Sequence, residues 1–357
     1  MNTDVLITGL KVSVDWLSFT VMDDSMNIFS VMQFLGLDSS CFSPAPRGAM
    51  GYRSMLNLDG YALSILSDGN ENMGIHVNIG GSAFGHILEC YAMRKSSDTP
   101  FGGMAFETQE LGMSVLTNFL SDVKKFAHIA RIDLALDDIG DVHFSIDDLQ
   151  KYLSEGRVLS KFRKYTNNVS RKINNDEMVG GTLYFGSSQS DVRLRIYDKQ
   201  LEYNSKHSDQ IDTPWVRWEF QLRNDRAAIA ADHIIHAQDD LGSVVAQILN
   251  NYFRIIMLDD SNRSRCSIHP AWVLFLGAVG VLKLSQKKMP KTMEDKKNWI
   301  IEQVLPTLTG IIIADGGVFD IITDHWDKSV ERIHSDMLSL IDQALKARSD
   351  ESIQVSA

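Results

Sequence analysis

The sequence predicts an α+β protein with mostly antiparallel sheets and packed helices, followed by a mainly helical C-terminal region. Short segments in which apolar and polar residues alternate recur up to Arg223, as half-buried strands require. Turn signals such as Asp59-Gly60 separate neighbouring segments, which is typical of antiparallel hairpins. After Asn224 the apolar residues recur at helical spacing instead.

Each expected strand is an alternating run between turn signals, and each expected helix has apolar residues three or four positions apart. Strands are expected at 12–21, 52–58, 61–67, 74–79, 130–137, 181–186, 191–198 and 214–223. Helices are expected at 23–37, 82–94, 107–126, 145–156, 227–231, 244–256, 268–284 and 328–346. Ser145 is expected to cap its helix with Asp148 at the third position, and Gly156 to end it.

The order of strand, helix, hairpins and helix occurs roughly twice, which is consistent with two pseudo-repeated halves. We predict an N-terminal α+β half at 1–128 and a second α+β half at 129–260, which carries the strand of Tyr197. A mainly helical region at 261–345 follows. The polar end, 346–357, is expected to be a disordered tail.

Composition limits the class of protein. The chain has 357 residues, of which 44% are hydrophobic, enough for a substantial core. Its three cysteines are far apart, so they indicate neither a zinc site nor a disulfide framework. The N-terminus lacks a basic signal-peptide start, and the longest apolar run is too short to span a membrane. These features predict a cytoplasmic protein with reduced thiols and no membrane partner.

Residues 193–199, Arg-Leu-Arg-Ile-Tyr-Asp-Lys, form the most informative strand. Alternation places Tyr197 on the polar face together with Arg193, Arg195 and Lys199. Ionising a phenol of pKa ~10 at pH 7 costs about 4 kcal/mol, and neighbouring cations lower that cost. The same cations bind phosphate, so Tyr197 is a candidate nucleophile toward a phosphodiester. The alternative is a solvated strand face on which Tyr197 is only a residue that favours β-structure.

Two further strands carry carboxylates on an equivalent polar face. Asp133 and Asp137 follow Arg131 in one, and Glu219 follows Arg217 in the other. If these strands are neighbours of the Tyr197 strand, Asp133 and Glu219 can hold Mg²⁺ or Mn²⁺, which prefer oxygen ligands. The third ligand stays open, and its candidates are Asp137, Asp15 and Asp198. The alternative for each carboxylate is a salt bridge to the arginine two residues earlier in the same strand.

The net charge of −11 argues against general nucleic-acid binding, but the basic residues are concentrated locally. One segment has six basic residues and no acid, with polar and aromatic residues between them, which suits a loop or hairpin along a DNA backbone. Its basic residues are Arg157, Lys161, Arg163, Lys164, Arg171 and Lys172. A second basic patch contains Lys287, Lys288, Lys291, Lys296 and Lys297. The alternative for both segments is a solvated surface.

Several short motifs occur in the order known from rolling-circle replication initiators. They are Arg-Ile-Asp-x-x-x-Asp-Asp at 131–138, Gly-Gly-Thr-Leu-Tyr-Phe-Gly-Ser at 180–187, Arg-Ile-Tyr-Asp-Lys at 195–199 and Arg-Trp-Glu at 217–219. The chain resembles this family, which is found on plasmids of the pT181 type, in conjugative elements as relaxases, and in filamentous phages. The matches extend over most of residues 12–310. The length and the C-terminus are more similar to a phage initiator than to a plasmid one.

The resemblance implies a metal-dependent enzyme that nicks one DNA strand at an origin hairpin. It implies that Tyr197 becomes linked to the 5′ phosphate and leaves a 3′ hydroxyl for a polymerase. Asp133 and Glu219 match acidic positions of the metal site, and Arg193, Arg195 or Lys199 would stabilise the transition state. It also implies origin DNA, a host superfamily-1 helicase and a homodimer as partners, in a bacterial cytoplasm.

Two other functions are considered. A DNA-binding regulator on the same fold would bind DNA without covalent capture, and Arg131 and Arg217 would then be DNA contacts, as they are in the nicking hypothesis. A tyrosine recombinase would need its tyrosine on a helix behind a His-x-x-Arg motif, and no such motif precedes Tyr197.

Overall fold

The structure is a computed structural model that describes residues 8–97, 111–175, 178–237 and 240–280, with parts of 297–345. The chain divides into two compact units. The first comprises Met1–Gly36 and Pro44–Gln286, and the second comprises Leu37–Ser43 and Lys287–Ala357. The four segments predicted from the sequence stay a prediction. The predicted tail and all of the second basic patch except Lys297 lie outside the described residues.

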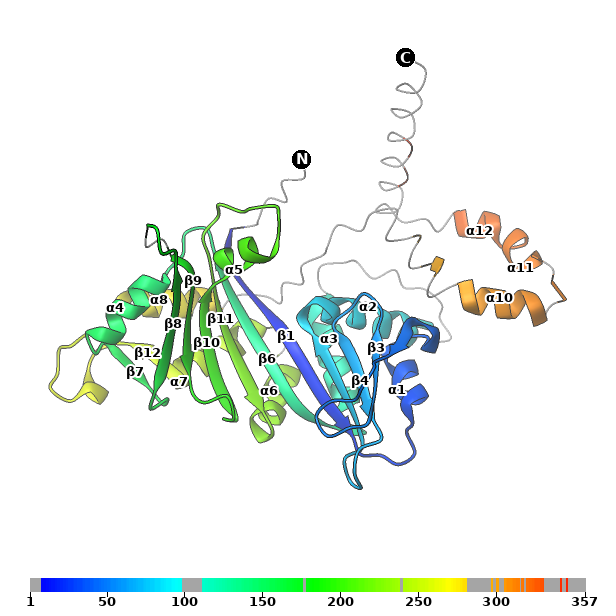
Figure 1. The fold of residues 1–357 in the computed structure, drawn as a ribbon, viewed down its shortest axis with the longest axis horizontal. Coiled ribbons are helices and arrows are strands. Elements are labelled where there is room, and N and C mark those ends of the chain that lie inside the picture. Colours follow the sequence, from blue (N-terminus) through cyan, green and yellow to red (C-terminus); the bar gives the residue numbers. More distant parts are fainter. Residues whose placement is uncertain are drawn as a thin grey trace, which may run out of the picture. The chain divides into compact units, whose positions relative to one another are not determined.

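One antiparallel sheet dominates the first unit, with strands in the order β3-β4-β5-β1-β6-β11-β10-β9-β8 (Figure 1). Their bounds are β3 (Ser54–Leu58), β4 (Leu63–Ser67), β5 (Ile75–Gly80), β1 (Gly9–Val21), β6 (Ala127–Ile139), β11 (Trp215–Arg223), β10 (Val192–Asp198), β9 (Met178–Phe185) and β8 (Tyr165–Arg171). The short strands are β2 (Phe42–Pro44), β7 (Val158–Ser160) and β12 (Phe253–Ile255), and β7 pairs with β12. The predicted α+β class with antiparallel sheets is confirmed.

The helices of the first unit are α1 (Ile28–Leu35), α2 (Gly81–Ser97), α3 (Leu111–Val123), α4 (Ile146–Ser154), α5 (Lys199–Lys206), α6 (Asp225–His236), α7 (Leu241–Tyr252), α8 (Pro270–Val279) and the 3₁₀ turn η2 (Arg263–Arg265). The second unit contains α10 (Leu305–Ala314), α11 (Asp320–Thr323), α12 (Trp326–Val330) and the 3₁₀ turn η1 (Ser39–Cys41). None of the helices in the described part of the chain has the length and apolar character that crossing a bilayer requires.

Local signals explain most of the helix ends. The predicted cap of α4 is confirmed, because Ser145 and Asp148 form a reciprocal capping box. Asp198 caps α5, a helix that the sequence did not predict. The helix predicted over 244–256 ends earlier, at Tyr252. Phe253 and Ile255 alternate into the core in β12, and both are fully buried, so burial overrides the helical pattern there.

The apolar face of the central strands carries the core of the first unit. Helices α6, α7 and α8 lie behind these strands in Figure 1, and α6 packs on β6 and β11. Trp218 of β11 meets Trp272 and Phe275 of α8, with ring centroids 5.8 and 5.5 Å away. Large aromatic side chains each bury ~150–250 Å², so this cluster holds the central strands rigidly from behind. The opposite face of the same strands is left for polar side chains.

Candidate functional site

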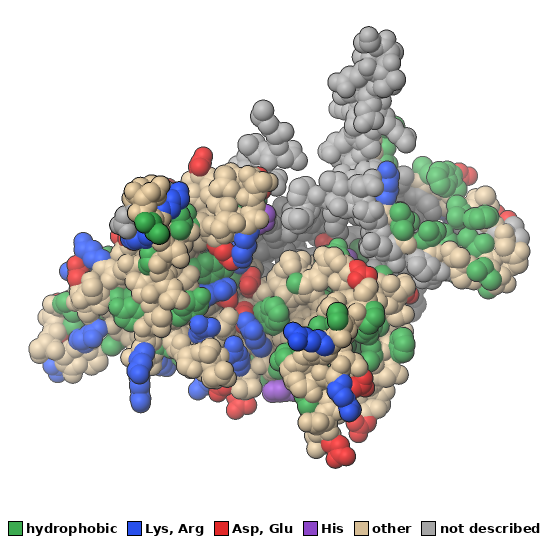
Figure 2. Space-filling view, viewed as in Figure 1, with side chains coloured by type: hydrophobic (Ala, Val, Ile, Leu, Met, Phe, Trp, Pro, Cys, Tyr) green, Lys and Arg blue, Asp and Glu red, His purple; other side chains and the backbone are tan. Residues whose placement is uncertain are grey.

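The three strands singled out from the sequence are neighbours, because β10 pairs with β11 and β11 pairs with β6. Directly opposed residues share a face of the sheet. Tyr197 lies opposite Arg217, which lies opposite Asp137, and Arg195 lies opposite Glu219. We call this side of β6, β10 and β11 the polar face. Figure 2 shows it toward the viewer, with Lys and Arg side chains gathered over these strands and Asp and Glu among them.

A β-bulge brings Asp15 of β1 to the polar face. Val14 pairs with Leu134 and Trp16 pairs with Asp133, so Asp15 is the extra residue between two pairs. The bulge lets Val14 point into the core while Asp15 and Trp16 both lie on the polar side. Simple alternation from Val14 places Asp15, a candidate metal ligand, on the polar side, but it would place Trp16 in the core, so Trp16 is the residue that the bulge displaces.

Arginine binds every carboxylate that was a candidate metal ligand except Asp198, whose side chain caps α5. Arg131 binds Asp133 through two hydrogen bonds of 2.8 and 2.5 Å, which is the salt bridge weighed as the alternative. The alternative named the wrong partner for Glu219. Its carboxylate binds Arg195 of the neighbouring strand at 2.5 Å, because cross-strand neighbours lie closer than residues two apart.

Arg217 binds two aspartates from two other strands. Its Nε and Nη2 donate to Asp137 at 2.7 and 2.8 Å, and its Nη1 donates to Asp15 at 2.8 Å. Trp215 donates a further hydrogen bond of 2.6 Å to Asp137. Burial opposes the charge of Arg217, but both aspartates outweigh it, and the pKa of Arg217 rises above its usual value. Its predicted DNA contact stays a prediction, and only 13% of the side chain is exposed.

Tyr197 lies beneath basic side chains at the end of β10. The guanidinium carbon of Arg195 is 4.5 Å from the ring centroid, and Lys199 Nζ is 5.6 Å from it. Arg195 Nη2 reaches the phenol oxygen at 3.5 Å. Lys199 also pairs with Glu202. Two of the three cations that the alternation predicted, Arg195 and Lys199, therefore lie against Tyr197, whereas Arg193 lies over the ring of Tyr184.

The cations lower the pKa of Tyr197 as expected, but in the protein alone burial outweighs them. Tyr197 is only 5% exposed, and burial raises the pKa of its phenol above the usual value. The charges of Arg217 and Arg195 offset burial only in part, and Glu219 adds to the rise. The phenol is thus protonated at neutral pH until a bound substrate changes its surroundings.

The described residues do not form a ready metal site. No group of three or more histidine, cysteine, aspartate or glutamate side chains within them is placed to hold a metal ion. Burial nevertheless raises the pKa of Asp133 to about 6, against the charge of Arg131, and the charges of Glu219 and Asp15 add to the rise. Asp133 and Glu219 could therefore serve as metal ligands only after releasing Arg131 and Arg195.

The raised pKa of Asp133 predicts a stability effect with a defined sign. Well below pH ~4 the Asp133 carboxyl is protonated in both the folded and the unfolded protein. As the pH rises toward 6, the unfolded protein loses this proton while the folded protein still keeps it. Ionised Asp133 therefore destabilises the fold by about 3 kcal/mol, from ~2 pKa units at ~1.36 kcal/mol each. We expect wild type to lose this amount relative to Asp133→Asn between pH 4 and 7 in urea unfolding.

Glu202 provides a control of opposite sign for this measurement. Burial pushes its pKa up, but Lys199 and Lys206 outweigh burial and lower the pKa to about 2. Stability from Glu202 is present above its unfolded pKa and is lost as the pH falls. Relative to Glu202→Gln, wild type should therefore gain stability with rising pH. A flat wild-type-minus-Asp133→Asn difference would contradict the burial of that charge.

The predicted DNA-binding segment lies on β7, β8 and the loop between them. All side chains of β8 except Val169 are exposed, and β8 is the edge strand of the sheet beside β9. Lys161 donates to Asn251 at 2.5 Å, and Arg157 pairs with Glu155. Arg163 and Lys164 precede β8 in the loop, Arg171 is the last residue of β8, and Lys172 follows it. Their DNA contacts stay a prediction.

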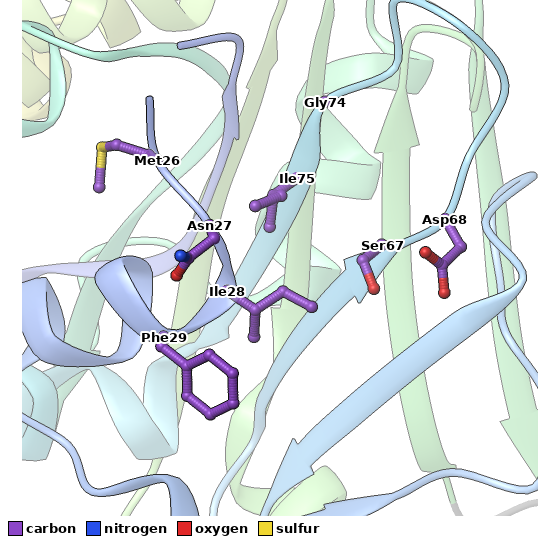
Figure 3. A pocket seen from close by; sticks show the side chains of 8 residues that line it. All are labelled: Met26, Asn27, Ile28, Phe29, Ser67, Asp68, Gly74 and Ile75. Carbon is purple, nitrogen blue, oxygen red and sulfur yellow. The ribbon is translucent and has the colours of Figure 1, made fainter. Parts of the chain in front are cut away.

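A pocket elsewhere in the first unit does not belong to this site (Figure 3). It lies between the segment before α1 and the ends of β4 and β5, and β1, β6 and β11 separate β5 from β10. Its lining residues are Met26, Asn27, Ile28, Phe29, Ser67, Asp68, Gly74 and Ile75. Asp68 is its only ionisable residue, so the pocket lacks the paired charges of the polar face.

The motifs, the sheet and the polar face match one class of protein. A family model described as a replication initiation factor matches residues 127–325. A solved structure of a rolling circle replication initiator protein from Geobacillus stearothermophilus is similar, with a TM-score of 0.64 and 31% sequence identity. The similarity covers 79% of this chain and 100% of that one.

A protein of Bacillus subtilis (strain 168) named as a DNA relaxase, NicK, is 28% identical over 291 residues. That similarity covers 80% of this chain and 76% of NicK. The chain belongs to the replication initiation factor family, which is the rolling-circle initiator family that its motifs resemble.

Some residues of the site were missed in the sequence. Trp215 begins a predicted strand, but its hydrogen bond to Asp137 depends on pairing between β11 and β6. Tyr184 lies opposite Arg195, and the guanidinium of Arg193 lies 4.4 Å from its ring. Gln221 is buried on the polar face beside Glu219. In the sequence, Tyr184 could have been found only from its position in the motif at 180–187. Gln221 could have been found from the alternation of its strand, which places it on the same face as Glu219.

Proposed function

We propose that the protein starts rolling-circle replication by nicking one DNA strand at an origin hairpin, with Tyr197 as the nucleophile. The observation that supports this most is the convergence of Tyr197, Arg195 and Glu219 on one open sheet face. Membership of the initiator family supports the same reaction. A cytoplasmic site of action in a bacterial host follows from this proposal.

The reaction replaces one phosphodiester by another. The Tyr197 oxygen attacks the scissile phosphorus, and the bond to the 3′ oxygen breaks, giving a 5′-phosphotyrosine and a free 3′ hydroxyl. Arg195 reaches the phenol oxygen and can also meet a non-bridging phosphate oxygen, with Lys199 near the ring of Tyr197. Arg193, four residues earlier in β10, is a weaker candidate for the same role. Bond energy is kept in the phosphotyrosine, so the same groups rejoin the strand without ATP.

The phenol must lose its proton during attack, and burial makes that loss costly. Glu219 shares the guanidinium of Arg195 with the phenol, so it is our candidate for the proton acceptor. A phosphate brought to Arg195 would compete with Glu219 for the guanidinium. Substrate binding therefore frees the carboxylate at the moment when the proton must move.

The proposal retains Mg²⁺ or Mn²⁺ as a cofactor, with Asp133 and Glu219 as its ligands after the arginines move, and Asp137 as a weaker candidate because Arg217 and Trp215 bind it. Such an ion would withdraw charge from the scissile phosphate. Titrating Mn²⁺ into the protein should show binding that Asp133→Asn weakens.

The test of the function is covalent capture. Purified protein is incubated with single-stranded, hairpin-bearing DNA from its own replicon and Mg²⁺, and the products are run on a denaturing gel. We expect a protein–DNA adduct and a free 3′ end that a polymerase extends. Tight binding with no adduct on any such DNA would favour a non-catalytic DNA-binding regulator, the second candidate that the charged polar face permits.

Salt dependence tests the basic segment. Arg163 and Lys164 lie in the loop before the exposed edge strand β8. If each contacts one phosphate, Arg163→Ala and Lys164→Ala should each weaken binding to all sequences and reduce the slope of log K against log salt by about 1. Lys328→Ala in α12 is the control and should leave the slope unchanged. Unaltered slopes in both loop variants would remove this segment from the DNA interface.

The helicase and dimer partners stay predictions of the family resemblance. Both concern assembly at the origin after the nick, when the duplex must be unwound from the free 3′ end. Helicase binding can be tested by adding a purified superfamily-1 helicase of the host to the nicked complex. Dimer formation can be tested by measuring the mass of the protein in solution.

A further inference from the structure

Arg193, Gln221 and Asp133 form a row across three strands of the polar face. Arg193 lies opposite Gln221, and Gln221 lies opposite Asp133. The row is four residues from Tyr197 along β10, or about 13 Å at ~3.3 Å per residue. A DNA strand whose scissile phosphate lies at Tyr197 can therefore place a nearby nucleotide over this row.

Gln221 has an acceptor without a partner at the centre of the row. The side chain is 8% exposed, and its Nε2 donates to Glu219 Oε1 at 3.3 Å. Because a carboxylate can only accept, this bond fixes which end of the amide faces Glu219. Gln221 Oε1 then has no hydrogen-bond partner among the described residues. Buried polar atoms normally have one, which indicates a partner supplied by a ligand.

Two pairs of arginine and aromatic side chains lie on either side of Gln221. The guanidinium of Arg193 is 4.4 Å from the ring of Tyr184 on β9, and that of Arg131 is 5.0 Å from the ring of Trp16 on β1. Arg193 Nε also lacks a partner within the described residues. Guanidinium planes and aromatic rings are the surfaces on which unpaired bases stack.

We propose that Gln221, with Arg193 and Tyr184, forms a subsite for one unpaired nucleobase close to the scissile phosphate. The inference rests on the proposed function, since it needs single-stranded DNA on the polar face. The guanidinium of Arg193 moves aside so that the base reaches the buried amide, and the base then stacks on that guanidinium. Gln221 Oε1 accepts a hydrogen bond from an N–H group of the base.

The amide also determines which bases fit. A glutamine side chain presents an acceptor beside a donor, which matches a base with an amino group beside a ring-nitrogen acceptor. Adenine and cytosine have this arrangement. Guanine and thymine present a carbonyl oxygen beside a ring N–H, so they match the same amide only when the base is turned over. Because a DNA strand bound in one direction presents its bases in one orientation, the subsite prefers one of these pairs, adenine and cytosine or guanine and thymine, at one position.

The experiment measures binding without cleavage in the full-length Tyr197→Phe protein. Fluorescein-labelled single-stranded oligonucleotides span the nick site, with each of the four bases placed in turn at each position near it. We expect one position at which one of these pairs, adenine and cytosine or guanine and thymine, binds on the order of 10-fold or more tighter than the other pair. Adding Gln221→Leu should reduce that preference to below about 3-fold and leave the other positions unchanged.

Three further variants distinguish recognition from folding. Gln221→Met keeps the length of the side chain and should also lose the preference, whereas Tyr184→Leu should weaken binding of every base at that position without changing their order. Gln247→Leu, on the exposed side of α7, is the matched control and should alter neither. A base preference unchanged in both Gln221 variants overturns the subsite, as does equal binding of all four bases at every position. Absence of any covalent adduct in wild type overturns the proposed function instead.

Discussion

Tyr197→Phe should abolish the covalent protein–DNA adduct while origin DNA still binds. Removing the nucleophile of a covalent mechanism slows the reaction on the order of 10³-fold or more. The ring of Tyr197 stays in phenylalanine, so Arg195 retains the aromatic surface that it covers at 4.5 Å. The lost hydroxyl has one long contact of 3.5 Å to Arg195, so the stability of the fold should change by about 1 kcal/mol at most.

The measurement compares three proteins on the same single-stranded hairpin DNA. Tyr165→Phe is the control, because Tyr165 is an exposed tyrosine in the basic segment, 47% accessible, and belongs to no charged cluster of the polar face. Wild type and Tyr165→Phe should form adduct at comparable rates. An undiminished adduct in Tyr197→Phe would show that another residue attacks, and mass spectrometry of the DNA-linked peptide would identify it.

Alternation in sequence predicted the polar face correctly because the side-chain period of a strand is strictly two. Tyr197, Arg195 and Glu219 follow directly from that period once β10 and β11 pair. No single segment indicates which strands pair. The pairing was inferred because three strands share the same pattern of one apolar face and one face with charged residues. Trp16 departs from the same rule, because the extra residue in β1 leaves Asp15 and Trp16 on one side of the sheet.

The ion pairs were harder to predict than the positions. The alternative to a metal site was pairing within a strand, and this alternative is correct for Arg131 and Asp133. Glu219 instead binds Arg195, and Arg217 joins β11 to Asp137 and Asp15. The partner of an arginine in a sheet depends on the register between strands, which periodicity does not give. The pKa of Tyr197 was missed for a related reason, since burial depends on everything packed around it.

Arg217 gives the second large effect, and it concerns stability. Arg217→Met leaves Asp137 and Asp15 without their cation, although Trp215 still donates to Asp137. Removing one partner of a buried ion pair costs about 3–5 kcal/mol. We expect a loss of that size in urea unfolding at pH 7. Arg265→Met is the control, because Arg265 is 66% exposed and binds Asp260 at 3.2 Å, so its loss should cost about 1 kcal/mol at most.

The pH dependence shows whether an unpaired charge causes this loss. Without Arg217, Asp137 is a buried carboxylate that has lost its cation, and burial disfavours its charged form. Protonation then favours the folded state, so the stability gap between wild type and Arg217→Met should narrow as the pH falls toward 5. Adding Asp137→Asn should recover part of the loss at pH 7. A stability gap that does not change with pH would indicate that the loss comes from the packing of the Arg217 methylene chain. In that case the side chain, and not its charge, would hold β1, β6 and β11 together.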